Sequence, residues 1–328
     1  MNRRPLGKTG IRVSEIGFGA WGIGGQMWQG GSDADAKEAL RAALDLGVDF
    51  VDTALVYGDG HSERLIGSVL RERGPREAVF VATKIPPMDY AWPGKSRTPL
   101  SRTFPARHVV ESAETSLRNL GVQALDLEQL HVWHDAWLDD FVWPETRRAM
   151  ERLREEGKVR HWGVSVNDHA PETALRLLRD PIVETVQVIY NVFDRSPESA
   201  LFPLARERGL GVIARVPFDE GTLTGAIRPE TTFPRGDWRE AYFRGDRRAE
   251  AARRADALRP FLGEEAESLP ELALRFCLSR PEVSTVIPGM RRTEHVRANV
   301  AVSDGRGLSP SLLERLRPHA WEKNWYEP

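Results

Sequence analysis

Asp52-Thr53-Ala54-Leu55-Val56-Tyr57-Gly58-Asp59-Gly60-His61-Ser62-Glu63 is the stretch that decides the fold. It follows a short apolar strand predicted for residues 48–51, so Asp52 stands at the carboxyl end of that strand, where parallel α/β folds bind their ligands. Two glycines then break the chain, and Ser62 is predicted to cap a helix. Tyr57 is therefore expected on a loop above the sheet. Taken alone, Asp52 is better interpreted as a turn cap and Tyr57 as an ordinary half-buried aromatic; the two together favour a functional site.

Outward from this stretch, predicted strands and helices alternate along the chain. Strands are predicted to end near Gly19, Asp52, Lys84, His131, Ser165, Tyr190, Arg215 and Ile287. Helices are predicted over residues 33–46, 62–72, 106–120, 144–156, 173–178, 249–262 and 269–278, and from Thr293 onward. Eight strands alternating with helices predict an α/β fold, a closed (β/α)8 TIM barrel. We expect one domain over residues 1–328, with long loops at the C-terminal mouth.

Composition limits the class of partner. The 328 residues fit one large barrel, for which about 250 residues is typical. A net charge of -2 argues against nucleic acid and acidic membrane surfaces, which leaves small molecules. The single cysteine, Cys277, excludes an intrachain disulfide, and no run approaches the roughly 18 apolar residues of a membrane span. We expect a cytoplasmic protein without a metal ion; the sequence makes no prediction of its oligomeric state.

The segment Gly17–Gly22 matches the G-x-G-x-x-G pattern of dinucleotide-binding Rossmann folds. That motif requires a helix to begin at its last glycine. Four further glycines instead keep this chain irregular until Ser32 or Asp33 caps the next helix. The segment is therefore interpreted as a glycine-rich loop after a strand.

Asp52, Tyr57, Lys84 and His131 follow predicted strands two, three and four, whose carboxyl ends share one mouth in a barrel. Five motifs in this order closely resemble the aldo-keto reductases: Asp52-Thr53-Ala54 with Tyr57-Gly58 and Ser62-Glu63, Thr83-Lys84, Gln129-Leu130-His131, Gly163-Val164-Ser165, and Ile287-Pro288-Gly289. The resemblance spans about residues 4–299. It implies NAD(P)H-dependent reduction of an aldehyde, ketone or sugar carbonyl to an alcohol, or the reverse. It also implies Tyr57 as general acid, tuned by Lys84 and Asp52, with His131 orienting the carbonyl oxygen.

Elementary electrostatics supports these roles. A tyrosine has a pKa near 10, so proton transfer near pH 7 requires a shift of about three units, or roughly 4 kcal/mol. An ammonium about 4 Å from the phenolate supplies roughly that at an effective dielectric of about 20. We therefore expect Lys84 to lower the Tyr57 pKa, Asp52 to keep Lys84 charged, and His131 to be a neutral donor. The alternative for His131 is a packed barrel histidine bonded to a carbonyl.

The resemblance also implies contacts to a nicotinamide cofactor. Ser165 and Gln187 match positions that bond the carboxamide, and Asn167 is expected to replace the family's asparagine, which is Val166 here. Arg215 stands where most members stack a tyrosine on the nicotinamide; a guanidinium is planar and can stack too. The other implied cofactor contacts are Gly19, Ala20, Trp21, Asp52, Pro217, Phe218, Gly221, Leu223, Gly225, Pro288, Gly289, Met290, Arg291, His295 and Asn299.

NADPH is expected to be preferred over NADH. Arg291 and Arg292 lie at the start of the predicted final helix, where a 2′-phosphate would meet a guanidinium and the positive helix end. The alternative is that both arginines are solvated. Ala298 replaces the family's common glutamate, which weakens one adenine contact.

The expected substrate pocket consists of Trp21, Tyr57, Trp92, His131 and Trp133. Trp137 is expected at the same rim, with Trp321 and Trp325 as further candidates, because flat apolar faces suit sugar rings and aryl carbonyls. Two other functions stay open. A strand-end lysine beside acids is also typical of a Schiff-base aldolase using Lys84, and the resemblance includes cofactor-sensing binding proteins such as potassium-channel β subunits.

Overall fold

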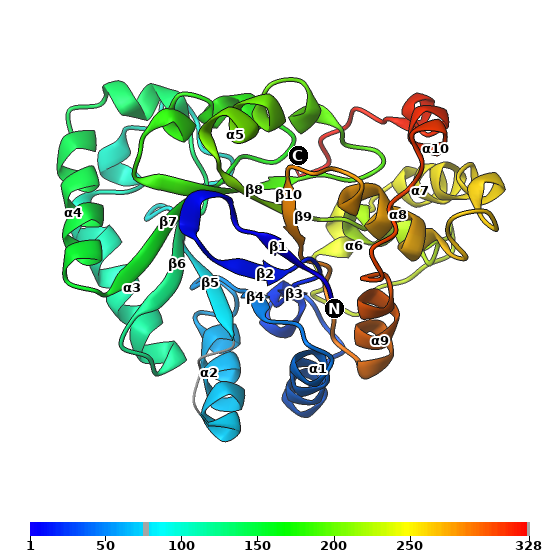
Figure 1. Ribbon diagram of the computed structural model, residues 1–328, viewed down its shortest axis with the longest axis horizontal. Helices are drawn as coiled ribbons and strands as arrows, with labels where there is room; N and C mark the ends of the chain where they lie inside the picture. Colours follow the sequence, from blue (N-terminus) through cyan, green and yellow to red (C-terminus); the bar gives the residue numbers. More distant parts are fainter. Residues whose placement is uncertain (75–78, 327–328) are drawn as a thin grey trace.

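A ring of eight parallel strands forms the centre of the computed structural model, which describes residues 1–74 and 79–326 (Figure 1). The strands pair with their neighbours in chain order from β3 to β10. They are β3 (Phe18–Gly19), β4 (Phe50–Asp52), β5 (Phe80–Ile85), β6 (Leu125–Leu130), β7 (Val159–Ser165), β8 (Val183–Ile189), β9 (Gly211–Arg215) and β10 (Val283–Val286).

The ring closes between its first and last strands. Ile16 pairs with Val286 and Gly19 pairs with Gly289 as parallel bridges. The amide of Gly17 donates to the carbonyl oxygen of Val286 at 2.8 Å. A Cβ on Gly19 would lie 2.6 Å from the carbonyl oxygen of Ile287, so this close approach requires glycine. The predicted barrel is confirmed, and the glycine-rich loop following β3 does not begin a long helix.

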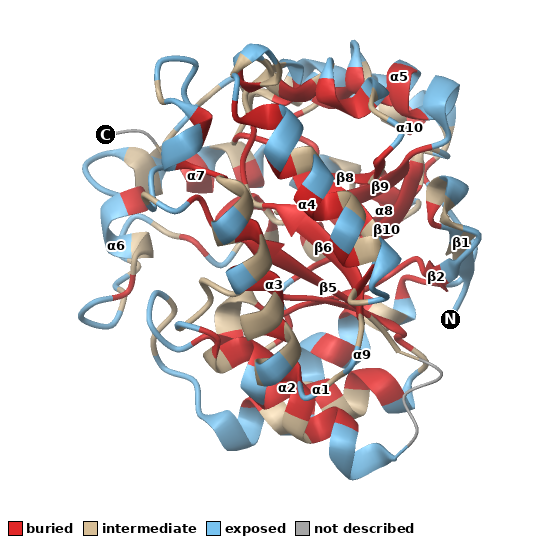
Figure 2. Cartoon of the chain, turned by 90° about the vertical axis from the view of Figure 1, so that its left-hand side faces the viewer, coloured by how far each residue is buried: buried red, intermediate tan, exposed pale blue. Residues whose placement is uncertain are grey.

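Helices surround the strands. They are α1 (Asp33–Asp45), α2 (His61–Arg73), α3 (Ala106–Leu120), α4 (Trp143–Glu155), α5 (Leu201–Arg208), α6 (Arg239–Tyr242), α7 (Arg247–Asp256), α8 (Leu269–Leu278), α9 (Thr293–Ala301) and α10 (Pro310–Arg315). The ring strands are mostly buried, whereas the helices show buried and exposed faces (Figure 2). α9 contacts α1, which completes the outer layer where the ring closes (Figure 1).

An antiparallel hairpin of β1 (Arg3–Pro5) and β2 (Arg12–Ser14) precedes the ring. Leu6, at its turn, is fully buried and packs with Phe50, Leu127 and Ile213 in a cluster contributed largely by barrel strands. The amide of Lys8 donates to the carbonyl oxygen of Gly209, just before β9, so the hairpin covers the amino end of this strand, opposite the mouth.

Local signals explain the helix boundaries that the sequence predicts well. Ser32 caps α1 by accepting a hydrogen bond from the amide of Asp35. The predicted span 106–120 is the observed α3, and Gly121 ends it with φ of +69°. These caps satisfy backbone groups that the helix ends would otherwise leave without partners.

Several predictions differ from the structure. Ser62 does not cap α2; the helix begins one residue earlier after Gly60, and the Ser62 hydroxyl instead bonds Thr53 and the carbonyl of Ala20 within the protein. The predicted helix at 173–178 is two 3-10 turns, Pro171–Ala174 and Leu177–Arg179. The predicted helix at 249–262 is α7 followed by a 3-10 turn, Arg259–Phe261. The short helices α5, α6 and α10 were not anticipated.

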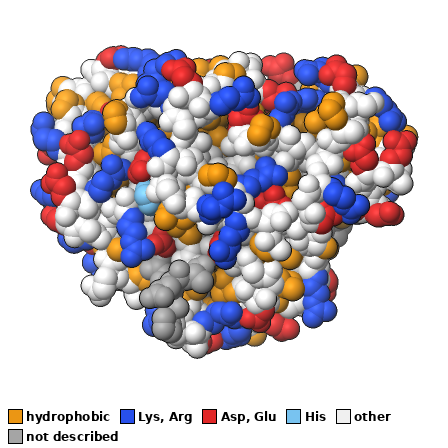
Figure 3. All heavy atoms as spheres, in the orientation of Figure 1, with side chains coloured by type: hydrophobic (Ala, Val, Ile, Leu, Met, Phe, Trp, Pro, Cys, Tyr) orange, Lys and Arg blue, Asp and Glu red, His pale blue; other side chains and the backbone are white. Residues whose placement is uncertain are grey.

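The surface agrees with the balanced composition. Basic and acidic side chains intermingle over the face shown in Figure 3. Within the described ranges, no helix has both the length and the apolar character needed to cross a bilayer.

Candidate active site

Lys84 and Asp52 form a buried ion pair at the barrel mouth. Lys84 Nζ donates to Asp52 Oδ1 at 2.7 Å and to the carbonyl oxygen of Thr53 at 2.6 Å. The two side chains are only 1 % and 3 % exposed. Burial raises the pKa of Asp52 and lowers the pKa of Lys84, while their attraction to each other opposes both shifts. Adjacent parallel strands β4 and β5 supply the pair, as expected for strand ends in a barrel.

Tyr57 and His131 lie beside this pair. Lys84 Nζ is 5.1 Å from the centre of the Tyr57 ring, and the rings of Tyr57 and His131 are 5.9 Å apart, edge to face. Burial, followed by the charges of Lys84 and Arg215, holds the pKa of His131 well below its ordinary value. The imidazole is therefore neutral at pH 7. The structure brings together the four residues that the sequence singles out.

The Tyr57 pKa moves in the opposite direction from our expectation. Burial, and then the charge of Asp52, raise the pKa of Tyr57 well above 10. Lys84 Nζ bonds to Asp52 and to the carbonyl oxygen of Thr53 rather than to the phenol, and its charge does not outweigh these effects. In the protein alone Tyr57 is thus a neutral phenol, which holds the proton that a donor needs but is a weaker acid than free tyrosine.

Gln187 and Ser165 lie at the ends of β8 and β7 and are buried. Gln187 Nε2 donates to Asp52 Oδ1 at 3.3 Å, whereas its Oε1 has no partner among the described residues. A buried amide oxygen without a partner is costly, and a carboxamide N–H would satisfy it. This part of the mouth therefore fits a nicotinamide.

Asn167 has a different environment from the one expected. Its Oδ1 accepts from the amide of Gly94 at 2.9 Å, and its Nδ2 donates to the carbonyl oxygens of Gly94 and Trp133, both at 3.0 Å. The amide is thus used to clamp the loop after β5 to the loop after β6. The Oδ1 and Nδ2 atoms of Asn167 are therefore engaged with the neighbouring backbone and are not available to the carboxamide of a cofactor.

Arg215, at the end of β9, is fixed by a side-chain contact that the sequence did not suggest. Its Nη2 donates to Asp168 Oδ1 at 2.7 Å and to the carbonyl oxygen of Val166 at 3.0 Å, while its buried Nε has no partner in the described structure. The guanidinium is therefore held in one orientation at the position expected beside the nicotinamide.

The segment after β9 carries an unusual backbone. Val216, Asp219 and Glu220 have φ of +55°, +47° and +56°, values that residues other than glycine rarely adopt. Gly221 follows with φ of +106°. Among the other residues implied in cofactor binding, Pro217 and Leu223 are buried and Phe218 and Gly225 half-buried.

The residues implied around the cofactor's adenosine end follow β10. Pro288 and Met290 are buried, Gly289 and His295 are exposed, and Asn299 Nδ2 is buried without a partner among the residues described. Arg291 reaches back to donate to the carbonyl oxygen of Gln29 at 3.0 Å and lies 5.4 Å from the Trp28 ring. Arg292 is exposed beside Glu294 at 3.4 Å.

Aromatic side chains cover much of the mouth. The Trp21 ring lies 5.0 Å from Trp238, 5.5 Å from Trp28 and 6.3 Å from Tyr57, and Ala20 beneath it is fully buried. Trp92 is 39 % exposed and approaches the His131 ring edge-on at 5.8 Å. Sequence reasoning missed Trp28 and Trp238, because both lie in stretches without periodicity, and only their residue type gave a signal.

Trp133 and Trp137 do not lie at an open rim. Both are almost wholly buried, and their rings pack edge to face at 5.3 Å. Trp137 Nε1 donates to the carbonyl oxygen of Thr98, so this indole anchors the loop between β5 and α3. Across residues 1–74 and 79–326, no group of three or more His, Cys, Asp and Glu is arranged to hold a metal ion.

Comparisons with known proteins agree with this geometry. The model of the Aldo/keto reductase family matches residues 15–319. An aldo-keto reductase of Bacillus subtilis is 32% identical over 302 residues, covering 91% of this chain and 87% of that protein. A probable voltage-gated potassium channel subunit beta of Arabidopsis thaliana is 32% identical over 335 residues, covering 96% and 95%. The structure of a glycerol dehydrogenase from Gluconobacter oxydans matches with a TM-score of 0.78 at 28% identity, covering 97% of this chain and 94% of that one. The chain therefore belongs to the aldo/keto reductase family and is an NAD(P)H-dependent oxidoreductase.

Proposed function

We propose that this protein reduces the carbonyl group of an aldehyde, ketone or sugar to an alcohol with NADPH, or catalyses the reverse reaction. The convergence of Tyr57, His131, Lys84 and Asp52 at one barrel mouth carries the proposal. When bound, the reduced nicotinamide supplies a hydride to the carbonyl carbon. A balanced reduction then needs one proton at the carbonyl oxygen.

Tyr57 is the proton donor in this proposal. Its raised pKa keeps the phenol protonated, and His131 lies 5.9 Å away, between ring centres, with a neutral imidazole. A neutral imidazole holds the carbonyl oxygen by a hydrogen bond without competing to protonate it. Lys84 stabilises the phenolate that remains, and Asp52 keeps the Lys84 ammonium charged and aimed.

Buried polar atoms without hydrogen-bond partners around the mouth indicate which residues hold the cofactor. Gln187 Oε1 and Asn299 Nδ2 lack hydrogen-bond partners among the described residues. The space where Gly289 would carry a side chain is open, with no atom of the described residues within 4 Å of a Cβ placed there, so a ligand can approach its backbone. Together with Arg215 and Arg291 they support a bound dinucleotide running from β8 to α9. The many aromatic rings at the mouth favour a substrate with a flat apolar face, such as a sugar ring or an aryl carbonyl.

The single cysteine, Cys277, is buried and forms no disulfide, which supports a cytoplasmic location for the protein.

The test is turnover. Purified protein is mixed with NADPH or NADH and a panel of sugars, aldehydes and keto compounds, and loss of reduced-nicotinamide absorbance is followed. Oxidation of NADPH or NADH in the presence of at least one carbonyl compound, lost in Tyr57→Phe, supports the proposal.

The similarity to a potassium channel subunit favours one other candidate, a cofactor-sensing binding protein, which would bind NADPH tightly without turnover across the panel. Borohydride trapping of a carbonyl on Lys84 would instead reveal an aldolase.

A further inference from the structure

Residues 321–326, which we call the C-terminal segment, pack against residues 216–225. Lys323 Nζ donates to Asp219 Oδ1 at 2.8 Å. The Lys323 and Asp219 side chains are 4 % and 2 % exposed, and Asp219 Oδ2 has no other partner within the described residues. A charge this deeply buried is tolerated only when it is paired. Lys323 is therefore the counter-charge of the buried Asp219 carboxylate.

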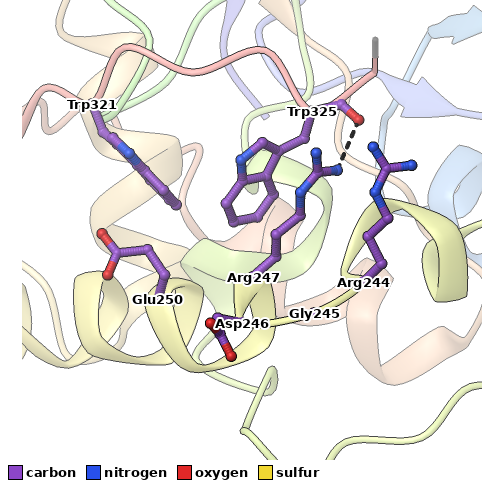
Figure 4. A pocket seen from close by; sticks show the side chains of 7 residues that line it. All are labelled: Arg244, Gly245, Asp246, Arg247, Glu250, Trp321 and Trp325. Carbon is purple, nitrogen blue, oxygen red and sulfur yellow. Dashed lines mark hydrogen bonds between the residues drawn. The ribbon is translucent and has the colours of Figure 1, made fainter. Parts of the chain in front are cut away.

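The Lys323 ammonium is held on several sides. It lies 4.6 Å from the centre of the Trp325 ring and 4.9 Å from that of Trp321, and it donates to the Tyr242 hydroxyl at 3.0 Å. Cations bind well over such aromatic faces. Arg247 Nη1 donates to the carbonyl oxygen of Trp325 at 3.2 Å and so ties the segment to α7 (Figure 4). The outer faces of Trp321 and Trp325 border an open hollow of about 590 Å³, which Arg244 also lines.

A second contact joins the same two segments. The Tyr326 hydroxyl donates to the Glu220 carboxylate. The Tyr326 ring stacks on Trp238 at 6.1 Å, and Trp238 packs at 5.0 Å on Trp21, whose ring faces Tyr57. A continuous row of aromatic rings thus runs from the C-terminal segment to the candidate proton donor.

The backbone between these contacts would not hold its shape unaided. Val216, Asp219 and Glu220 all adopt left-handed conformations, and Val216 is β-branched, the type least suited to that region. Conformations of this kind persist only where surrounding contacts impose them. Lys323 and Tyr326 bond directly to two of the three strained residues.

We propose that Lys323 is a positioning residue for cofactor binding, acting as a latch that fastens residues 216–225 over the bound dinucleotide and neutralises Asp219 beside its diphosphate. The inference rests on the proposed function, because the resemblance implies cofactor contacts at Pro217, Phe218, Gly221, Leu223 and Gly225, and this stretch resembles the family's loop that folds over the cofactor's diphosphate. It adds a residue from a distant part of the chain, one that touches neither the reacting atoms nor the tetrad. Losing Lys323 frees the loop and leaves a carboxylate beside a dianionic group, so the dinucleotide should leave faster.

The experiment measures how fast NADPH leaves the protein. Preformed complexes of the unmodified protein, Lys323→Met, Asp219→Asn and the double variant are chased with excess NADP⁺ in a stopped-flow fluorimeter. We expect Lys323→Met to accelerate dissociation at least tenfold. The double variant should lie between Lys323→Met and the unmodified protein, because it loses the latch but carries no unpaired carboxylate. If Lys323→Met does not fold, the double variant alone tests the proposal, and its dissociation rate should be at least threefold above that of the unmodified protein.

Two controls separate latching from general damage. Lys323→Arg keeps the charge and should remain within about threefold of the unmodified rate. Arg244→Met removes a cation from the same hollow, and no hydrogen bond or ion pair in the described structure joins Arg244 to residues 216–225. It should change the rate less than twofold. Hydrogen exchange of free Lys323→Met should be faster in residues 216–225 and unchanged in β4 to β6.

Failure of the latch and failure of the proposed function give different results. If the unmodified protein binds neither NADPH nor NADH, the proposed function is wrong. If it binds either one and Lys323→Met or the double variant releases it at the unmodified rate, the latch is wrong and the function stands. Purely additive effects of Asp219→Asn and Lys323→Met would likewise refute a direct pairing of the two side chains during binding.

Discussion

Lys84 Nζ lies 2.7 Å from Asp52 Oδ1, yet 5.1 Å from the centre of the Tyr57 ring, so the lysine is bonded to the acid and only faces the phenol. This geometry assigns Lys84 an electrostatic role and leaves the Tyr57 hydroxyl free for a substrate.

Tyr57→Phe should retain NADPH binding and lower carbonyl reduction at least a hundredfold. The change removes only a hydroxyl, and general acid catalysis typically contributes about 10²–10⁴ in rate. Steady-state kinetics and fluorescence titration measure the two quantities. Tyr90→Phe is the matched control, since Tyr90 is 60 % exposed on the loop after β5, and it should behave as the unmodified protein. Near-normal turnover in Tyr57→Phe would remove Tyr57 from the mechanism.

Lys84→Met should alter the pH dependence of turnover as well as its rate. Without the ammonium, the Asp52 carboxylate is unpaired near Tyr57, which raises the pKa of the phenol further. The limb of the pH profile that reports Tyr57 should therefore move to higher pH. Lys158→Met, at a lysine that is 35 % exposed and paired with Glu114, serves as control. A lower rate with an unchanged profile would show that Lys84 is only structural.

Arg215→Tyr should change cofactor affinity more than substrate choice. The Arg215 guanidinium is fixed by Asp168 at 2.7 Å, beside the expected nicotinamide ring, which becomes cationic on oxidation. Its charge disfavours the oxidised cofactor, so the variant should bind NADP⁺ more tightly relative to NADPH, by roughly twofold to tenfold for a partly neutralised charge. Fluorescence titration of both redox forms measures the ratio, and identical ratios in the two proteins would refute the placement of Arg215.

The unmodified protein should bind NADPH more tightly than NADH, and Arg291→Ala should remove most of the difference. A charge-assisted hydrogen bond is worth about 1.5–3 kcal/mol, roughly a tenfold to hundredfold preference. Arg291 must exchange its bond to the Gln29 carbonyl for the phosphate, which reduces the gain. Added salt should weaken NADPH binding more than NADH binding, because only NADPH carries the 2′-phosphate. Arg297→Ala, at an exposed arginine of α9, is the control. Equal affinities for NADH and NADPH would show that Arg291 does not read the phosphate.

Folding stability should fall between pH 4.5 and 7 because of Glu220. Burial, the largest influence, raises the pKa of Glu220 from 4.5 to about 7. The folded protein then binds a proton that the unfolded chain releases, so stability decreases as pH rises through this window and levels off above it. Glu220→Gln should flatten the decline and be more stable at pH 8 by up to about 3 kcal/mol. Urea unfolding at several pH values measures this, with exposed Glu322→Gln as control. Parallel curves for the unmodified protein and Glu220→Gln would contradict it.

Sequence reasoning reached the barrel and the four central residues because both rest on local signals. Several strands contain short apolar runs, and in a parallel barrel every strand end points to the same mouth, so the chain order alone gathers Asp52, Lys84 and His131. Glycine and serine at helix ends set the bounds of α1 and α3 for the same local reason.

The residues that escaped prediction depend on direction and on distant contacts. Asn167 is one position away from the expected asparagine, but only three-dimensional structure shows that its amide turns toward Gly94. The partners of Arg215 and Lys323, Asp168 and Asp219, are separated from them by 47 and 104 positions. The Tyr57 pKa was predicted with the wrong sign, because the degree of burial cannot be read from neighbours in sequence.

The closure of the ring between β3 and β10 also bears on how the protein is made. Ile16 can form its parallel bridge only after Val286 has been synthesised. Arg4 likewise donates to the carbonyl oxygen of Arg280, 276 positions away. At roughly 5–20 residues per second, a ribosome finishes β10 roughly 15–50 s after β3. Throughout that interval the β3 edge has no partner on one side, a state that invites pairing between nascent chains. During its synthesis this enzyme is therefore exposed to aggregation through the β3 edge until nearly the whole chain has emerged from the ribosome.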